Sequence, residues 1–311
     1  MEMENFVTLN NGKRIPQVAL GTSRIPVEKI EACVKLALEM GYRHIDTAFH
    51  YGNEVVIGKA LREYLETTDL KREDVFITTK LDAMYMEEDV VGPALDESLK
   101  RLGLEYVDLF LLHGPCAMKT FRHFPENPPL CREFMPVDLR ETWKGMEGTV
   151  YKGKARSIGV SSFNSKQLDY ICDAARIQPV VNQVLSLYVI DTGILDIKVY
   201  FPVELHARFP QKKLNEFCIS KNIQLEAFSP LGSPFFTGPE ELNTVQASDN
   251  LVENPIIVDI ARKYKRTAGQ VELHARFPQK KLDEFCISKN IQLEAFSPLG
   301  SPFFTGPEEL K

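Results

Sequence analysis

Residues 75–113 read VFITTKLDAMYMEEDVVGPALDESLKRLGLEYVDLFLLH and contain one full unit of the pattern that decides the fold. Two β-prone runs, Val75–Lys80 and Val107–His113, flank Val90–Leu102, in which apolar residues recur at helical spacing. A strand, a helix and a second strand in this order predict two parallel strands joined by a crossover helix.

The same alternation extends in both directions. Further strands are predicted at Val18–Thr22, His44–Ala48, Ala155–Ser161 and Val180–Val184, and helices at Glu28–Met40, Val55–Leu65, Leu139–Lys152 and Lys166–Arg176. A hairpin with an Asn-Gly turn, formed by Phe6–Leu9 and Ile15–Val18, precedes them. Six such units without a break in composition predict one domain over residues 1–311, an α/β fold of the (β/α)8 TIM barrel type.

Composition excludes several classes of protein. The 311 residues are 44% hydrophobic and 26% charged, as in a soluble globular protein, and the net charge of −6 argues against general nucleic-acid binding. The six cysteines show no paired spacing, which indicates a reduced, cytoplasmic protein. No run has the length and apolarity of a membrane span, the start has no apolar signal, and no metal ion is expected.

Two segments interrupt the alternation. Residues 114–138 form a long segment rich in proline and aromatic residues directly after His113, which is typical of a lid or a substrate-pocket wall. Residues 185–202 are either a surface insertion in a loop or an insert that splits one strand and turn. We favour the second interpretation, because Asn182-Gln183-Val184 would join smoothly to Glu204-Leu205-His206.

Forty residues occur twice. Residues 203–242 return as 271–310, with Asn215 replaced by Asp283 as the only difference. Repeat architectures usually need three or more units, so two copies indicate a segment duplication or an irregular transcript. Both joins fall at a Gln-Val dipeptide, at 183–184 and 270–271, which favours a nucleic-acid joining event.

Successive predicted strands end in residues that suit carbonyl reduction. Asp46, Lys80 and His113 close three of them, and Tyr51 follows Asp46 in the next loop. Singly, each has a structural explanation, such as a helix cap, a solvated lysine or a core histidine. Together, at the carboxyl ends of barrel strands, they predict an active site in which Tyr51 donates a proton. The Lys80 ammonium would favour the phenolate, Asp46 would orient Lys80, and His113 would hydrogen-bond the carbonyl oxygen.

These residues lie in motifs that closely resemble the aldo-keto reductase superfamily over residues 6–184 and 203–270. The motifs are Gly21-Thr22, Gly41-Tyr42-Arg43-His44-Ile45-Asp46-Thr47-Ala48, Tyr51-Gly52-Asn53-Glu54, Arg101-Leu102-Gly103, Ile158-Gly159-Val160-Ser161, Asn182-Gln183 and Phe228-Ser229-Pro230-Leu231-Gly232. The resemblance implies an (α/β)8 barrel that binds NADP(H), with Tyr51, Asp46, Lys80 and His113 as the catalytic tetrad. It implies cofactor contacts from Thr22, Asp46, Ser161, Ser162, Gln183, Phe228, Ser229, Leu231 and Ser233.

The chain also departs from the family pattern. Ser162 replaces the usual asparagine, and Ser23 and Gly114 stand where many members have pocket-lining tryptophans, so we expect a wider pocket with Phe121 or Phe124 as a wall. Trp143 lies in a predicted helix and is expected in the core. In the family, the eighth strand ends in a Lys-Ser pair and is followed by an arginine, and these residues hold the adenosine 2′-phosphate. In this chain they are missing, and the second copy stands in their place after Gln270.

The second copy could restore the barrel. Lys280–Lys289 is predicted as a helix and Ile291–Phe296 as a strand in the eighth position, although the same sequence suits the seventh position and the copies could compete. We expect a cytoplasmic, monomeric NADP(H)-dependent reductase of small aldehydes or ketones. The alternatives are an impaired or inactive reductase-like product and, with little specific support, a channel-associated regulatory subunit on the same barrel.

Overall fold

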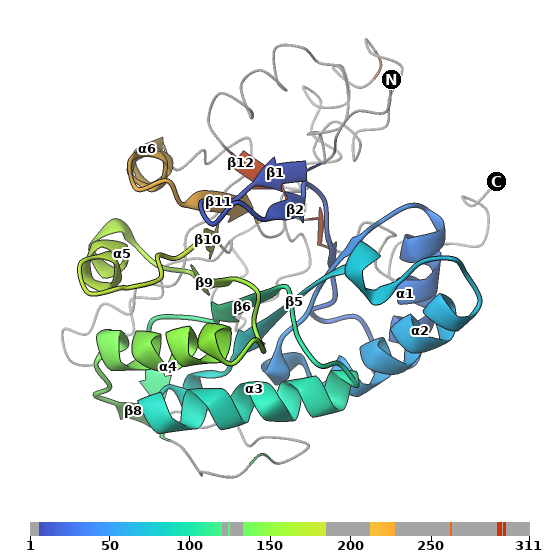
Figure 1. Ribbon diagram of the computed structural model, residues 1–311, viewed down its shortest axis with the longest axis horizontal. Coiled ribbons are helices and arrows are strands. Elements are labelled where there is room, and N and C mark those ends of the chain that lie inside the picture. The colour runs from blue at the N-terminus through green and yellow to red at the C-terminus, as the bar shows by residue number, and fades with distance from the viewer. Residues whose placement is uncertain are drawn as a thin grey trace, which may run out of the picture.

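A computed structural model describes residues 6–119, 124, 133–184, 212–227, 262, 291–293 and 295–296. In it, parallel strands occupy the centre and the helices lie around their outside (Figure 1). The barrel strands are β3 (Leu20–Gly21), β4 (His44–Asp46), β5 (Phe76–Leu81), β6 (Leu109–Leu112), β9 (Ile158–Ser161), β10 (Val181–Val184), β11 (Gln224–Ala227), β12 (Ile291–Leu293) and β13 (Ala295–Phe296). The α-helices are α1 (Val27–Glu39), α2 (Glu54–Glu66), α3 (Glu88–Leu102), α4 (Leu139–Tyr151), α5 (Ser165–Cys172) and α6 (Lys212–Ser220).

The strand order is that of a closed parallel barrel. From β3 to β11 each strand pairs in parallel with the next barrel strand along the chain. At the far edge, β12 pairs with β11, and β13 pairs with β3, the first strand. Residues 291–293 therefore lie beside the seventh strand and residues 295–296 beside the first.

Within the described residues, the two copies pair with different strands. The first copy contributes β11 to the seventh position, and the second copy contributes β12 and β13 to the eighth. Both short strands lie within the range Ile291–Phe296 that was predicted as one strand. The predicted helix Lys280–Lys289, the segment 185–202 and most of both copies lie outside the described residues.

The helices pack as their apolar spacing predicts. Helix α1 buries Ile30, Val34, Ala37 and Leu38, which lie on one face of the helix at helical spacing. Helices α2 and α3 approach each other at Gly58, where an added Cβ would lie 2.1 Å from the carbonyl oxygen of Leu102. Trp143 in α4 is 1% exposed, so the prediction that it lies in the core is confirmed. No helix of the described residues is long and apolar enough to cross a bilayer.

The N-terminal hairpin covers one end of the barrel. Strands β1 (Phe6–Thr8) and β2 (Arg14–Pro16) pair antiparallel across a turn in which Gly12 has a φ of 78°. Leu9 and Ile15 are buried against residues of β6 and β10. Asn10 donates a hydrogen bond to the carbonyl of Pro179 at the amino end of β10. Because the hairpin fills the amino ends of the strands, the chemistry is left to their carboxyl ends.

Part of the proline-rich segment 114–138 is described. Strands β7 (Ala117–Met118) and β8 (Phe134–Met135) pair antiparallel. The Phe124 ring is tilted against the Tyr85 ring at 4.8 Å and lies edge-on to the Phe49 ring at 6.4 Å, measured between ring centroids. Tyr85 belongs to the short 3-10 helix η3 (Ala83–Tyr85), one of three such turns with η1 (Phe49–Tyr51) and η2 (Arg72–Asp74) in the described residues. Phe121 lies outside them. Phe124 thus lies beside Phe49 of η1, the turn that carries Tyr51.

Candidate active site

A buried ion pair forms the centre of the site. The Lys80 ammonium, on β5, contacts a carboxylate oxygen of Asp46, the last residue of β4. The two side chains are 1% and 0% exposed. Removing two charges from water is costly unless they are paired and further hydrogen-bonded, so each residue depends on the other.

The predicted catalytic residues meet around this pair. Lys80 Nζ also donates to the carbonyl of Thr47 at 3.1 Å and lies 3.5 Å from the Tyr51 hydroxyl. The Tyr51 ring packs edge-on to the His113 ring, with 5.5 Å between the ring centroids. His113 directly follows β6, so the residues come from β4, η1, β5 and the end of β6. The structure therefore places Asp46, Tyr51, Lys80 and His113 in one cluster.

His113 is a neutral imidazole in this setting. Burial and, to a smaller extent, the nearby Lys80 ammonium lower the pKa of His113 to about 3. A neutral imidazole still carries one N–H and can donate a hydrogen bond to an oxygen without giving up a proton. The site thus has a neutral donor beside the Tyr51 ring.

The second oxygen of Asp46 is held by Gln183. The Gln183 side-chain nitrogen donates to Asp46 Oδ2 at 2.9 Å and to Glu226 Oε1 at 3.1 Å. Both acceptors are side-chain carboxyl oxygens, so these two hydrogen bonds fix the Gln183 amide with its nitrogen toward them. Glu226, on β11, is fully buried. A chain of contacts therefore links Glu226 through Gln183 and Asp46 to Lys80.

Other residues expected to contact a cofactor surround the same edge. Ser161 on β9 is 4% exposed and stands in register with Gln183 on β10. Its hydroxyl lies 3.3 Å from that of Ser162, which has a φ of 69° in the left-handed region, where asparagine is enriched. The N–H and hydroxyl of Thr22 both donate to the Asp46 carbonyl, at 3.0 and 2.8 Å. Phe228, Ser229, Leu231 and Ser233 lie outside the described residues.

Three polar residues at this edge were not among the predicted site residues. His50, immediately before Tyr51, hydrogen-bonds Asp82, and Glu226 contacts Gln183. The signal for Glu226 was present in the sequence, since Gln224 and Glu226 alternate with Leu225 and Ala227 and point to the opposite face of β11. For His50 and Asp82, the only sequence signal was their position, one residue before Tyr51 and two residues after Lys80.

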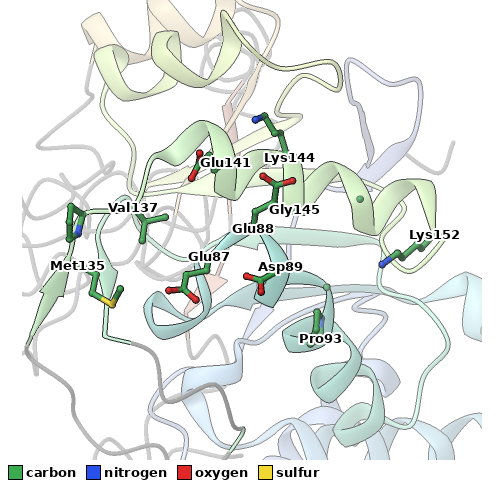
Figure 2. Close-up of a pocket in the computed structure, with 13 residues that line it drawn as sticks. Glu87, Glu88, Asp89, Pro93, Met135, Val137, Glu141, Lys144, Gly145 and Lys152 are labelled. Atoms are coloured by element: carbon green, nitrogen blue, oxygen red, sulfur yellow. The ribbon is translucent and has the colours of Figure 1, made fainter.

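A pocket of about 660 Å³ opens elsewhere on the surface. Figure 2 shows it lined by Glu87, Glu88 and Asp89 around the start of α3 and by Glu141 and Lys144 of α4. None of its lining residues belongs to the cluster around Lys80. We therefore assign the chemistry to the carboxyl ends of the strands rather than to this pocket.

Comparison with known proteins agrees with this geometry. Residues 17–274 match the model of the "Aldo/keto reductase family". The chain belongs to this family. Aldo-keto reductase family 4 member C11 of Arabidopsis thaliana is 38% identical over 86% of the chain and 75% of that protein. Aldo-keto reductase family 1 member C15 of Rattus norvegicus is 36% identical over 93% of the chain and 86% of that protein.

Solved aldo/keto reductases show the same fold. The aldose reductase of Schistosoma japonicum superposes with a TM-score of 0.74 at 34% identity, over 94% of this chain and 82% of that one. The aldo-keto reductase of Bombyx mori, solved in complex with NADP, gives a TM-score of 0.73 at 32% identity, over 94% and 83%. The (β/α)8 barrel expected from the sequence is confirmed.

Proposed function

We propose that this aldo/keto reductase uses NADP(H) to reduce small aldehydes or ketones to alcohols, with Tyr51 as the proton donor. The observation that carries the proposal is the contact network that joins Tyr51 to the buried Lys80–Asp46 pair beside a neutral His113. A tyrosine hydroxyl beside an ammonium and a neutral imidazole suits the protonation of an oxygen that becomes negative during reduction.

Each residue has a distinct task. The Tyr51 hydroxyl supplies the proton, and the positive charge of Lys80 at 3.5 Å favours the phenolate that remains. Asp46 and the Thr47 carbonyl hold the ammonium in place. The N–H of neutral His113 donates to the substrate oxygen and stabilises its developing charge. When bound, NADPH supplies the hydride.

The residues at the strand ends fit a nicotinamide amide. Ser161 offers a hydroxyl and Gln183 a carboxamide at the same level of adjacent strands, and the amide group of a nicotinamide both donates and accepts hydrogen bonds. Asp46 and Glu226 fix the Gln183 amide, so it is oriented before any ligand arrives. We assign Ser161, Ser162, Gln183 and Thr22 to this end of the cofactor, and Phe228, Ser229, Leu231 and Ser233 to its ring and pyrophosphate. We also propose a monomer in the cytoplasm.

A second candidate is a reductase with impaired or lost activity. The chain has the second repeat copy, residues 271–310, where the family's Lys-Ser pair and arginine grip the 2′-phosphate. Without a charged anchor, NADPH should lose its advantage over NADH. The two candidates differ in turnover rather than in fold.

Cofactor titration and turnover separate these candidates. Purified protein is titrated with NADPH and with NADH while the fluorescence of Trp143 is followed, and propanal reduction is then measured at 340 nm. The proposal predicts saturable NADPH binding and turnover that falls about 100- to 10,000-fold in Tyr51→Phe. The matched control Tyr151→Phe, at a 66% exposed tyrosine, should keep full activity. Folded protein that binds neither nucleotide, or Tyr51→Phe with unchanged turnover, would refute it.

A further inference from the structure

A histidine–aspartate pair lies at the edge of the proposed catalytic cluster. His50 Nδ1 is 2.8 Å from Asp82 Oδ2. His50 directly precedes Tyr51 in η1, and Asp82 follows β5 two residues after Lys80. The His50 ring lies 6.4 Å from the His113 ring, between ring centroids. The pair is therefore next to the groups assigned to the substrate oxygen, yet the reduction step gives it no task.

The two members of the pair differ in exposure. The Asp82 side chain is 6% exposed, whereas that of His50 is 52% exposed. Asp82 also accepts the backbone N–H of Met84 at 2.9 Å, so its carboxylate is fixed on both oxygens. Because Asp82 is fixed and buried, it sets the orientation of the more exposed imidazole.

The charges around His50 favour its protonated form. The hydrogen bond with Asp82 raises the pKa of His50, against the opposing effect of burial. Burial alone would raise the pKa of Asp82, but hydrogen bonds from His50 and Met84 hold it below its usual range. His113 is neutral, and the Lys80 charge is balanced by Asp46. With Nδ1 bound to Asp82, a protonated ring presents Nε2–H as a second donor.

We propose that His50, oriented by Asp82, is a specificity-determining residue that binds an oxygen atom on the carbon next to the substrate carbonyl. The enzyme then prefers small carbonyl compounds with a neighbouring hydroxyl or carboxylate over purely apolar ones. This inference rests on the proposed carbonyl reduction. A hydrophobic side chain at residue 50 would bind both kinds of compound by contact area alone.

Matched substrate pairs test this assignment. Propanal and 2-hydroxypropanal differ by one hydroxyl, and acetaldehyde and glyoxylate differ by a carboxylate in place of a methyl group. In the full-length protein, His50→Leu should lower kcat/KM for 2-hydroxypropanal about tenfold while changing that for propanal less than about twofold. Asp82→Asn should lower the ratio of kcat/KM for 2-hydroxypropanal to kcat/KM for propanal as well, but by a smaller factor. The glyoxylate pair tells whether a carboxylate is bound as well as a hydroxyl.

A structural role for the pair gives a different result. Asp138→Asn is the matched control, because Asp138 also caps a helix by accepting a backbone N–H two residues on, from Arg140. Asp138→Asn should leave unchanged the kcat/KM ratio of 2-hydroxypropanal to propanal and that of glyoxylate to acetaldehyde. If His50→Leu lowers kcat/KM equally for both substrates of each pair, or for neither, the inference is wrong, while the proposed carbonyl reduction is unaffected. If the folded wild-type protein reduces none of the four compounds, the proposed function fails and the inference falls with it.

Discussion

Replacing Lys80 by methionine should strongly destabilise the protein. Methionine keeps much of the volume of the lysine side chain but removes the ammonium, so the fully buried Asp46 carboxylate loses the charge that balances it. The hydrogen bond from Gln183 to Asp46, at 2.9 Å, remains but carries no positive charge. Breaking a buried ion pair by removing one partner costs about 3–5 kcal/mol. We therefore expect the free energy of unfolding to fall by about that amount.

A double-mutant cycle measures this effect. Urea unfolding at pH 7, followed by circular dichroism, is compared for Lys80→Met, Asp46→Asn and the double variant. The double variant should be about 2 kcal/mol more stable than Lys80→Met, because a neutral amide needs no counter-charge. Lys59→Met, at an exposed lysine paired with Glu31, should leave the unfolding free energy unchanged. A loss in Lys80→Met no larger than in Lys59→Met, or no recovery in the double variant, would refute the reasoning.

Three further predictions concern cofactor binding, pH and packing. Glu226→Leu removes one acceptor of the Gln183 amide and should weaken NADPH binding about tenfold in a fluorescence titration, with Glu226→Gln weakened less; equal affinities in both variants and the wild type would contradict this role. Burial lowers the pKa of His44 to about 3, so between pH 6.5 and 3 the unfolded state binds more protons, and stability should fall by about 1.4 kcal/mol per pH unit as the pH drops. His44→Gln should make urea unfolding between pH 4.5 and 6.5 less pH-dependent by that slope, and an unchanged slope would count against a neutral buried His44. Gly58→Ala should cost about 2 kcal/mol because its Cβ meets the Leu102 carbonyl, whereas Gly92→Ala, with only ordinary contacts, should not destabilise; equal melting temperatures would argue against the close approach of α2 and α3.

Sequence periodicity was sufficient to predict the barrel and the close approach of Asp46, Lys80 and His113 at one end of it. Each predicted helix and strand from residue 6 to 184 has a counterpart, and the differences lie at the ends. For example, the predicted strand Val107–His113 is observed as Leu109–Leu112, because Val107 forms only an isolated bridge with Ala155. Since parallel strands bring their carboxyl ends to one edge, residues that close successive strands had to meet.

Contacts between distant segments could not be predicted in this way. Gln183 and Glu226 are neighbours only because β10 and β11 pair in a register that places them side by side. The link between His50 and Asp82 likewise depends on how η1 lies over the end of β5. The choice between the seventh and eighth positions for two nearly identical copies also had no local signal. It depends on which strand each copy pairs with.

The most direct test of the central claim follows the transferred hydrogen itself. The wild-type protein is incubated with propanal and NADPH carrying two deuterium atoms at carbon 4 of the nicotinamide, and the alcohol is analysed by mass spectrometry. We expect propan-1-ol with one deuterium on its carbinol carbon, in a yield that falls sharply in Tyr51→Phe but not in Tyr151→Phe. Folded, NADPH-binding protein that yields no deuterated alcohol would contradict it.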